Sequence, residues 1–253
     1  MDVDPIESAK TEERLRSQGF GEDIFTVRLQ NFADIEKVVE DTGRRLDFIL
    51  ADLGVSSMQI DDPSRGFSYK VDGPLDLRMN PKKGSSAAER LKEVNEEELV
   101  GMLVENSDEP YAEEIAATVM KWQRKGKPIE TTTDMKHVIE EALVYVHKAE
   151  RAEAVKKSCQ RTFQALRIDV NSEFEVLYTF LDKLPEVLAP NGRVAILTFH
   201  SGEDRLVKRS FKQLKKQGIY SEINEDVIRP SAEECARNPR AKSTKMRWAI
   251  KAD

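Results

Sequence analysis

The chain has 253 residues, of which 39% are hydrophobic and 34% charged, and its formal net charge is −6. This length and balance suit a globular protein with a large core, and no stretch approaches the roughly 20 apolar residues that span a bilayer. The acidic first residues do not have the layout of a signal peptide and the two cysteines lie far apart, so we expect a cytoplasmic protein without a disulfide framework or membrane association.

The first predicted elements precede residue 53. β-branched and aromatic residues predict a strand over 23–32, a helix is expected over 33–43, and a short apolar run predicts a buried strand over 45–52. This strand stops at an acid, Asp52. Ligands of open α/β sheets bind at the carboxyl ends of strands, so Asp52 is a candidate site residue; the alternative is that it caps the segment after it.

A long segment with little periodicity follows over 52–81 and is rich in Gly, Pro, Asp and Arg. A loop of this length is either functional or disordered. Its aromatic side chains alternate with basic ones, which favours a surface that stacks on a flat ring beside a charged backbone. These side chains are Arg65, Phe67, Tyr69, Lys70 and Arg78.

The middle of the chain is helical in character from residue 87 to about residue 150, with Thr133 as a predicted N-cap. We expect a helical insertion with its own small core. Its Met and Trp residues are expected in that core rather than in a cofactor site: Met102, Met120, Trp122 and Met135. The expected organisation is a first core segment at 1–86, the insertion at 87–160, and a second core segment at 161–253.

The last third resumes the alternation of helices and strands. An amphipathic helix is predicted over 171–192, stopped by Pro190 and Gly192, and an apolar strand over 192–200. Helices alternating with short apolar strands indicate a parallel α/β sheet. The polar residues 198–205 follow this strand, so they and Asp52 are expected at the same edge of the sheet, where they would form a pocket.

Charge is distributed unevenly along the chain. Residues 205–253 contain thirteen basic and six acidic residues, a net charge of +7, so the remainder carries about −13. A basic patch on an acidic body can bind phosphate locally. A solvated helix face followed by a basic tail is an equally good explanation of this composition. The three histidines have no recognisable ligand spacing, so no metal site is expected.

Four blocks of the sequence resemble, in the same order, the bacterial 16S ribosomal RNA cytidine-N4 methyltransferases of the MraW type. They are "DLGVSSMQIDDPSRGFSYKVDGPLDLRMNPKKGSSAAE" (52–89), "RTFQALRIDVNSE" (161–173), "LAPNGRVAILTFHSGEDRLVK" (188–208) and "NPRAKSTKMR" (238–247). The resemblance implies a class I, Rossmann-like methyltransferase sheet with an all-helical insertion. It also implies S-adenosyl-L-methionine as cofactor and 16S ribosomal RNA or the small ribosomal subunit as partner. A homodimer is left open.

The resemblance also implies roles for individual residues. Asp2 would hold the cofactor ribose, Phe32 would lie beside the adenine, and Asp52 and Gln59 would make further cofactor contacts. Asp52 is expected to accept a proton or hydrogen bond from the cytidine amine, although it could serve the cofactor alone. His200 is the second catalytic candidate, with a structural hydrogen-bonding role as its alternative. No metal is needed by this chemistry.

RNA contacts are expected from three regions. Arg65, Phe67 and Arg78 belong to the stacking loop, whereas Arg161 and Arg167 lie in a block that the resemblance places near the substrate. Basic residues of the last block are predicted to contact phosphates: Arg240, Lys242, Lys245 and Arg247.

Two departures from the family pattern lead to further expectations. Gly202 stands where the family usually has leucine, which predicts a looser turn after the strand. The family's first strand and glycine-rich cofactor loop have no counterpart after Met1, which predicts exposed strand edges and residues 1–45 that pack loosely or dock differently. A truncated paralogue with impaired cofactor binding, acting as a non-catalytic RNA- or ribosome-binding protein, is therefore the main alternative. A weaker one is the same fold acting on another acceptor.

Overall fold

The computed structural model describes residues 1–253, which form two compact units. The core unit comprises residues 1–54 and 174–253, and the helical unit comprises residues 55–173. These boundaries differ from the expected segments because the loop side chains Leu75 and Leu77 are buried in the helical core, and because one unbroken helix runs past residue 160. None of the helices combines the length and the hydrophobicity that a membrane span requires.

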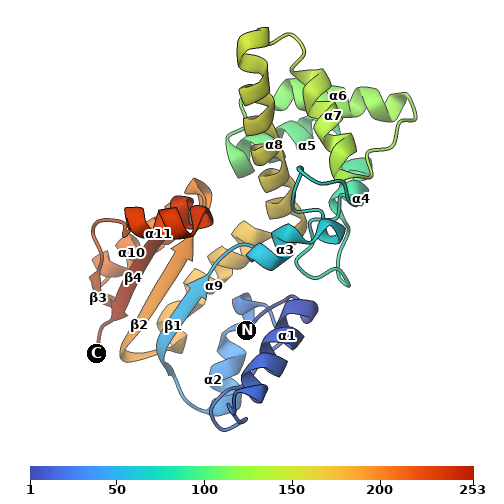
Figure 1. The fold of residues 1–253 in the computed structure, drawn as a ribbon. Coiled ribbons are helices and arrows are strands. Elements are labelled where there is room, and N and C mark those ends of the chain that lie inside the picture. The colour runs from blue at the N-terminus through green and yellow to red at the C-terminus, as the bar shows by residue number, and fades with distance from the viewer. The chain divides into compact units, whose positions relative to one another are not determined.

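The core unit contains a four-stranded sheet with the order β1-β2-β4-β3 (Figure 1). Only β1 and β2 are parallel, whereas β2–β4 and β4–β3 are antiparallel. The α/β class is confirmed, but the sheet is mixed rather than parallel. The elements of the core unit are α1 (Pro5–Ser17), α2 (Glu36–Thr42), β1 (Leu46–Asp52), α9 (Glu173–Val187), β2 (Leu188–Thr198), α10 (Ser201–Lys216), β3 (Tyr220–Ile223), α11 (Ala232–Arg237) and β4 (Lys245–Lys251). Short 3-10 turns lie at Phe32–Asp34 and Pro239–Ser243.

The core of this unit forms where apolar side chains of β2 meet those of α9 and α10. Val194 and Ile196 of β2 are fully buried, as are Leu184 of α9 and Val207 of α10. Successive side chains of β2 point to opposite faces of the sheet, so Val194 and Ile196 share one face. In the two helices, apolar residues recur with the 3.6-residue period and therefore lie on one side of each helix. This packing fixes the carboxyl ends of β1 and β2, which carry the candidate site.

The segment 23–32 does not form the predicted strand. Its only pairing is an isolated bridge between Leu29 and Asp2, and Ile24 and Leu29 are 68% and 58% exposed. Strand propensity reflects packing against neighbours, and here no neighbouring strand pairs with these residues. The predicted buried strand over 45–52 forms as β1, but it is an edge strand and is largely exposed: Phe48 and Leu50 are 61% and 59% exposed, and only Ile49 is buried.

Residues 32–35, which precede α2, are better packed than expected. Phe32 lies edge-on to Phe180 of α9, with ring centroids 5.1 Å apart, and Ile35 is buried in the same core. The Lys183 ammonium donates to the Ala33 carbonyl at 2.7 Å. The expected loose packing therefore does not extend to residues 32–35.

The helix before β2 is shorter than predicted, because α9 ends at Val187 and Pro190 lies inside β2. The strand accommodates an irregular turn at this point. Asn191 has a positive φ of 58°, and a Cβ at Gly192 would lie 2.7 Å from the Ala189 carbonyl oxygen and 2.9 Å from that of Leu46. Glycine is required here by the close approach of two backbones, not by the end of a helix.

The helical unit confirms the all-helical insertion. It contains α3 (Ser57–Asp61), α4 (Ala87–Glu93), α5 (Glu96–Ser107), α6 (Ala112–Arg124), α7 (Thr132–Ala142) and α8 (Lys148–Asn171), with a 3-10 turn at Pro63–Arg65. Met102 and Met135 are buried, and Met120 and Trp122 pack against the same core, as predicted. The N-cap of α7 is Thr131 rather than Thr133, because Thr131 and Asp134 form a reciprocal capping box.

The two cysteines have different surroundings and neither forms a disulfide. Cys159, on α8, is completely buried, and this burial raises the pKa of its thiol to about 12. Cys235, on α11, is partly exposed. The two thiols therefore differ strongly in their access to solvent.

Candidate functional site

Asp52 is the last residue of β1 and lies in register with Leu197 near the end of β2. Its side chain reaches solvent, yet partial burial and then the charge of Glu203 raise the pKa of its carboxyl group. The capping alternative is wrong, since the N-cap of the following helix α3 is Ser56. Asp52 is thus a strand-end carboxylate with an increased affinity for a proton.

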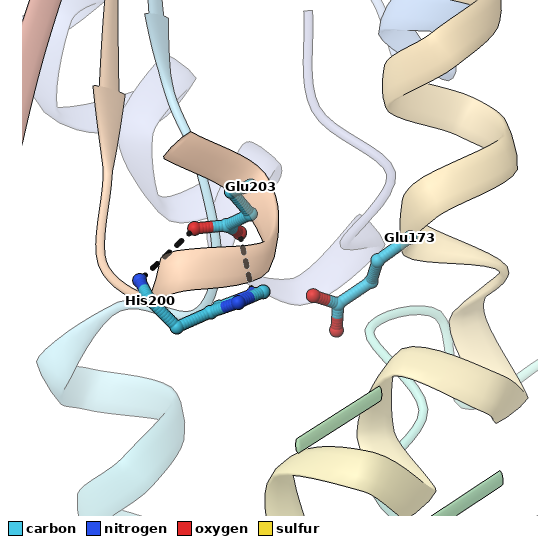
Figure 2. Close-up of side chains that lie close together, drawn as sticks. All are labelled: Glu173, His200 and Glu203. Carbon is cyan, nitrogen blue, oxygen red and sulfur yellow. Dashed lines mark hydrogen bonds and ion pairs between the residues drawn. The ribbon is translucent and has the colours of Figure 1, made fainter. Parts of the chain in front are cut away.

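The turn after β2 is organised by Glu203, which is only 3% exposed. Its Oε2 atom accepts hydrogen bonds from the backbone N–H groups of Phe199 at 2.9 Å and His200 at 3.4 Å. Its Oε1 atom lies 3.2 Å from Nε2 of His200. Figure 2 shows the imidazole of His200 facing this carboxylate. Asp52 and the Glu203–His200 pair therefore follow two strands that pair in parallel, so they lie at the same edge of the sheet, as the sequence argument expected for Asp52 and His200.

Glu203 was missed by the sequence reasoning, although a signal for it existed. A residue that precedes a helix and a Glu three positions later form a capping pattern, and His200 and Glu203 have this spacing. His200 is not an open catalytic histidine. Its side chain is 10% exposed, and its ring lies 5.8 Å from that of Phe174.

Gly202 lies in a tight rather than a loose turn, which corrects the expectation drawn from the missing leucine. A Cβ at this position would lie 2.6 Å from Cζ of Phe174 and 3.2 Å from Nδ1 of His200. The Phe174 ring occupies the space that the first side-chain carbon of any larger residue at position 202 would need. The apolar contact is therefore supplied by α9 instead of by residue 202.

The other predicted cofactor residues have separate local environments. Asp2 is exposed, and its Oδ1 atom accepts the N–H of Asp4 at 2.9 Å. Phe32 is half-buried on Phe180. Gln59, in the helical unit, is 7% exposed and caps α3, with its Oε1 atom accepting the N–H of Ser56 at 2.7 Å. Asp2 and Phe32 are thus partly accessible, whereas Gln59 has a structural role.

The long loop after Asp52 is ordered and is held by its own arginines. Arg65 is 5% exposed and donates to the carbonyls of Arg78 at 3.1 Å and Met79 at 2.8 Å, while its guanidinium lies 5.6 Å from the Phe67 ring. Arg78 forms a two-pronged ion pair with Asp76 at 2.8 and 2.6 Å. These two predicted RNA-binding arginines shape the loop rather than project from it.

Asn171, the last residue of α8, fixes the same loop. Its Oδ1 atom accepts the N–H of Met79, and its Nδ2 atom donates to the carbonyls of Leu77 and Arg167, each at 2.8 Å. Leu77 is buried and has a φ of +63°, a conformation that costs energy for a residue with a side chain. The contacts of Asn171 compensate for this strain.

The remaining basic candidates differ in how far they are exposed to solvent. Arg167 forms a bidentate ion pair with Glu173 at 2.7 and 3.0 Å, whereas Arg161 is half-buried. Arg240 and Lys242 are exposed on the 3-10 turn Pro239–Ser243. Of the basic candidates, these two lie most openly on the surface.

Lys245 and Arg247 point from β4 toward Asp204 of α10. The Arg247 side chain is 7% exposed and lies 2.7 Å from the carboxylate, and the 17% exposed Lys245 lies 3.3 Å from it. Burial alone would raise the pKa of Asp204, but the hydrogen bond and charge of Arg247, followed by Lys245, hold it below its usual value. Both cations are engaged in the fold instead of being open to phosphate.

Comparison with known proteins identifies the family. The MraW methylase family matches residues 1–252. The chain is 67% identical over its full length to "Ribosomal RNA small subunit methyltransferase H 1" of Lachnoclostridium phytofermentans, covering 69% of that protein, and 63% identical to the protein of the same name from Agathobacter rectalis, covering 72%. It is 37% identical over 98% of its length to "Ribosomal RNA small subunit methyltransferase H" of Thioalkalivibrio sulfidiphilus, covering 81%. The chain therefore belongs to the MraW methylase family.

Proposed function

We propose that this protein methylates the N4 amine of a cytidine in small-subunit (16S) ribosomal RNA, with S-adenosyl-L-methionine as the methyl donor. The observation that carries the proposal is a proton-accepting carboxylate, Asp52, at a strand end of a chain that belongs to a methylase family. The relatives named above are ribosomal RNA methyltransferases. These names favour catalysis over the alternative of a non-catalytic RNA-binding protein.

The side chains of the core unit fit the proposed cofactor chemically. The exposed carboxylate of Asp2 can accept hydrogen bonds from ribose hydroxyls, and the half-buried ring of Phe32 offers an apolar surface to adenine. The Asp52 carboxylate suits a positively charged group. When bound, S-adenosyl-L-methionine supplies a methyl group activated by its sulfonium.

The acceptor amine is a poor nucleophile because its lone pair is delocalised into the cytosine ring. Asp52 can orient this amine by accepting a hydrogen bond, and can take the proton that is lost as the new N–C bond forms. Burial and Glu203 raise the pKa of Asp52, so its carboxylate is a stronger acceptor than an ordinary aspartate. Such general-base assistance contributes about 10²- to 10⁴-fold to rate. The enclosed His200 is assigned a supporting role.

For RNA recognition, Arg240 and Lys242 are the proposed phosphate contacts, because both are exposed. Arg161 remains a candidate near the substrate. The other basic candidates form ion pairs or hydrogen bonds within the fold, and we assign them a structural role: Lys245, Arg247, Arg65, Arg78 and Arg167. In this arrangement, Phe67 is the stacking candidate, held next to the Arg65 guanidinium.

The test is methyl transfer from labelled S-adenosyl-L-methionine to isolated small ribosomal subunits, followed by nuclease digestion and mass spectrometry of the nucleosides. We expect N4-methylcytidine, and a loss of about 10²-fold or more in rate for Asp52→Asn. Glu222→Gln is the control, because it removes one charge from an exposed position on β3. Absence of label, label on another atom, or full activity of Asp52→Asn would contradict the proposal.

A further inference from the structure

We propose that the solvent-facing side of α10 binds the phosphate backbone of the RNA substrate, outside the nucleotide that is methylated. The choice of RNA as partner rests on the proposed function, whereas the arrangement of charges does not. The surface is a row of five exposed basic side chains, here called the basic row: Arg205, Lys208, Arg209, Lys212 and Lys216.

The basic row follows from the period of the helix. Its members are three or four residues apart, so they lie along one side of α10, over a length of about 16 Å from Arg205 to Lys216. The opposite side of α10 is apolar, and its Val207 and Phe211 are buried in the core of the same unit. This packing holds the basic row toward solvent.

None of the five side chains forms an ion pair or a hydrogen bond within the protein. Elsewhere, exposed cations of helices pair with an acid one turn away, as Lys156 of α8 does with Glu153 and Arg237 of α11 does with Glu233. The acids of α10 are engaged elsewhere, because Glu203 is buried in the turn after β2 and Asp204 pairs with cations of β4. The basic row therefore has no internal counter-charge.

This arrangement has an energetic cost for the protein by itself. Arg205 and Arg209 are four residues apart, as are Lys208 and Lys212, and like charges at this spacing repel each other. An acid within the row would remove the repulsion, as it does in α8 and α11. A solvated helix face explains the exposure of the row but not its single sign, which favours a polyanionic partner.

The buried side of α10 decides between two kinds of polyanion. A basic amphipathic helix can lie on a membrane when its apolar side enters the lipid. In α10 that side already packs in the core, so it has no apolar surface to insert. Exposed Lys and Arg side chains suit phosphate groups of a nucleic acid backbone, which they bind without reading bases.

The basic row begins at the sheet edge that carries the proposed site. Asp52 pairs with Leu197 near the end of β2, and α10 starts at Ser201, just after that strand. The exposed turn Pro239–Ser243 ends at the same edge, because β4 begins there beside Thr198. The row leads from this edge toward the other end of α10, so it would hold RNA beyond the methylated nucleotide and act on affinity rather than on the chemical step.

The direct test is filter binding of a radiolabelled 16S ribosomal RNA transcript at about 50 to 200 mM salt. The variant is Lys208→Gln/Lys212→Gln, and the control is Lys156→Gln/Lys157→Gln, which removes the same charge from exposed positions of α8. We expect the α10 variant to bind about tenfold more weakly, with a salt slope of log K that is smaller by about 1 to 2. The control should bind like the wild type.

Three binding results would overturn the proposal. They are an unchanged affinity and slope in the α10 variant, an equal loss in variant and control, and a loss of binding to phosphatidylserine vesicles without a loss of RNA binding. The transcript assay needs no methyl transfer. A protein that binds RNA through α10 but transfers no methyl group would therefore contradict the proposed function alone.

Stability separates RNA binding from a role in the fold. Glutamine has nearly the helix propensity of lysine, and the α10 variant also relieves the repulsion between Lys208 and Lys212. Its midpoint in urea should therefore be equal to or above that of the wild type. A clearly lower midpoint would show that the two lysines serve the fold and would overturn the proposal.

Kinetics give a second readout. With isolated small ribosomal subunits as substrate, the α10 variant should show a KM raised by about tenfold and a kcat within about twofold of the wild type, because only binding outside the reacting group is lost. A lower kcat with an unchanged KM would assign the row to the chemical step and overturn the proposal.

Discussion

Replacing Gly202 by alanine adds one methyl group where the Phe174 ring already lies. The new Cβ would be 2.6 Å and 3.0 Å from two ring carbons of Phe174, closer than the 3.4 Å at which ordinary contacts begin. Overpacking of this kind costs about 1–3 kcal/mol, whereas alanine gains at most about 1 kcal/mol over glycine in a helix. We therefore expect Gly202→Ala to lower the free energy of unfolding by about 0–3 kcal/mol.

Urea unfolding followed by circular dichroism measures this change. Gly101→Ala is the matched control: Gly101 lies inside α5, and nothing lies within 4 Å of the position of its Cβ. This control should gain up to about 1 kcal/mol, because only the helix-propensity term acts. Trimming the ring in the double variant Gly202→Ala/Phe174→Leu should recover part of the loss. If Gly202→Ala were stabilised as much as Gly101→Ala, the packing of Phe174 over position 202 would be refuted.

Further expected outcomes concern other contacts. Arg247→Ala leaves the largely buried Asp204 with Lys245 alone and should lower the free energy of unfolding by about 3 kcal/mol, as measured in urea; an unchanged stability would show the ion pair to be incidental. Asn171→Ala removes three hydrogen bonds and should cost about 2–3 kcal/mol, with faster amide exchange in the loop, and normal exchange would contradict its anchoring role. The pKa of Asp52 is raised in the folded state, so the folded protein binds a proton there more tightly than the unfolded chain does. The resulting stabilisation should be complete below the unfolded-state pKa, near 4, and should be lost as the pH rises through the folded-state pKa. Thermal melts recorded across pH should show this loss in the wild type and not in Asp52→Asn. Lys242→Glu should weaken RNA binding and reduce the salt slope of log K by about 1–2, and an unaltered slope would remove it from the RNA surface.

Local patterns allowed correct prediction of much of this fold. The apolar run that stops at Asp52 forms β1, and the helical periodicity of the middle of the chain forms a separate unit. Both signals are contained in short windows, where an apolar run or a helical period indicates the type of element. The burial of β1 was not predictable in this way, because it depends on which strands pair beside it. The strand predicted over 23–32 failed because its residues have strand propensity but no partner in the sheet.

The site was only partly predictable for a related reason. Sequence spacing placed Asp52 and His200 at strand ends, but it could not show that Glu203 turns inward beneath His200. Charge counting likewise treated Arg247 and Lys242 alike, although one lies against Asp204 and the other is exposed. The direction of a long side chain depends on tertiary contacts that a local window does not contain.

The contrast between the two cysteines has a practical consequence. The thiolate is the reactive form of cysteine, so a buried thiol with a pKa of about 12 is almost inert toward maleimides at neutral pH. Cys235 is partly exposed and lies close in sequence to Arg240 and Lys242. A maleimide dye added to the unmodified protein should therefore attach at Cys235 alone. Its fluorescence should then report the binding of RNA near Arg240 and Lys242.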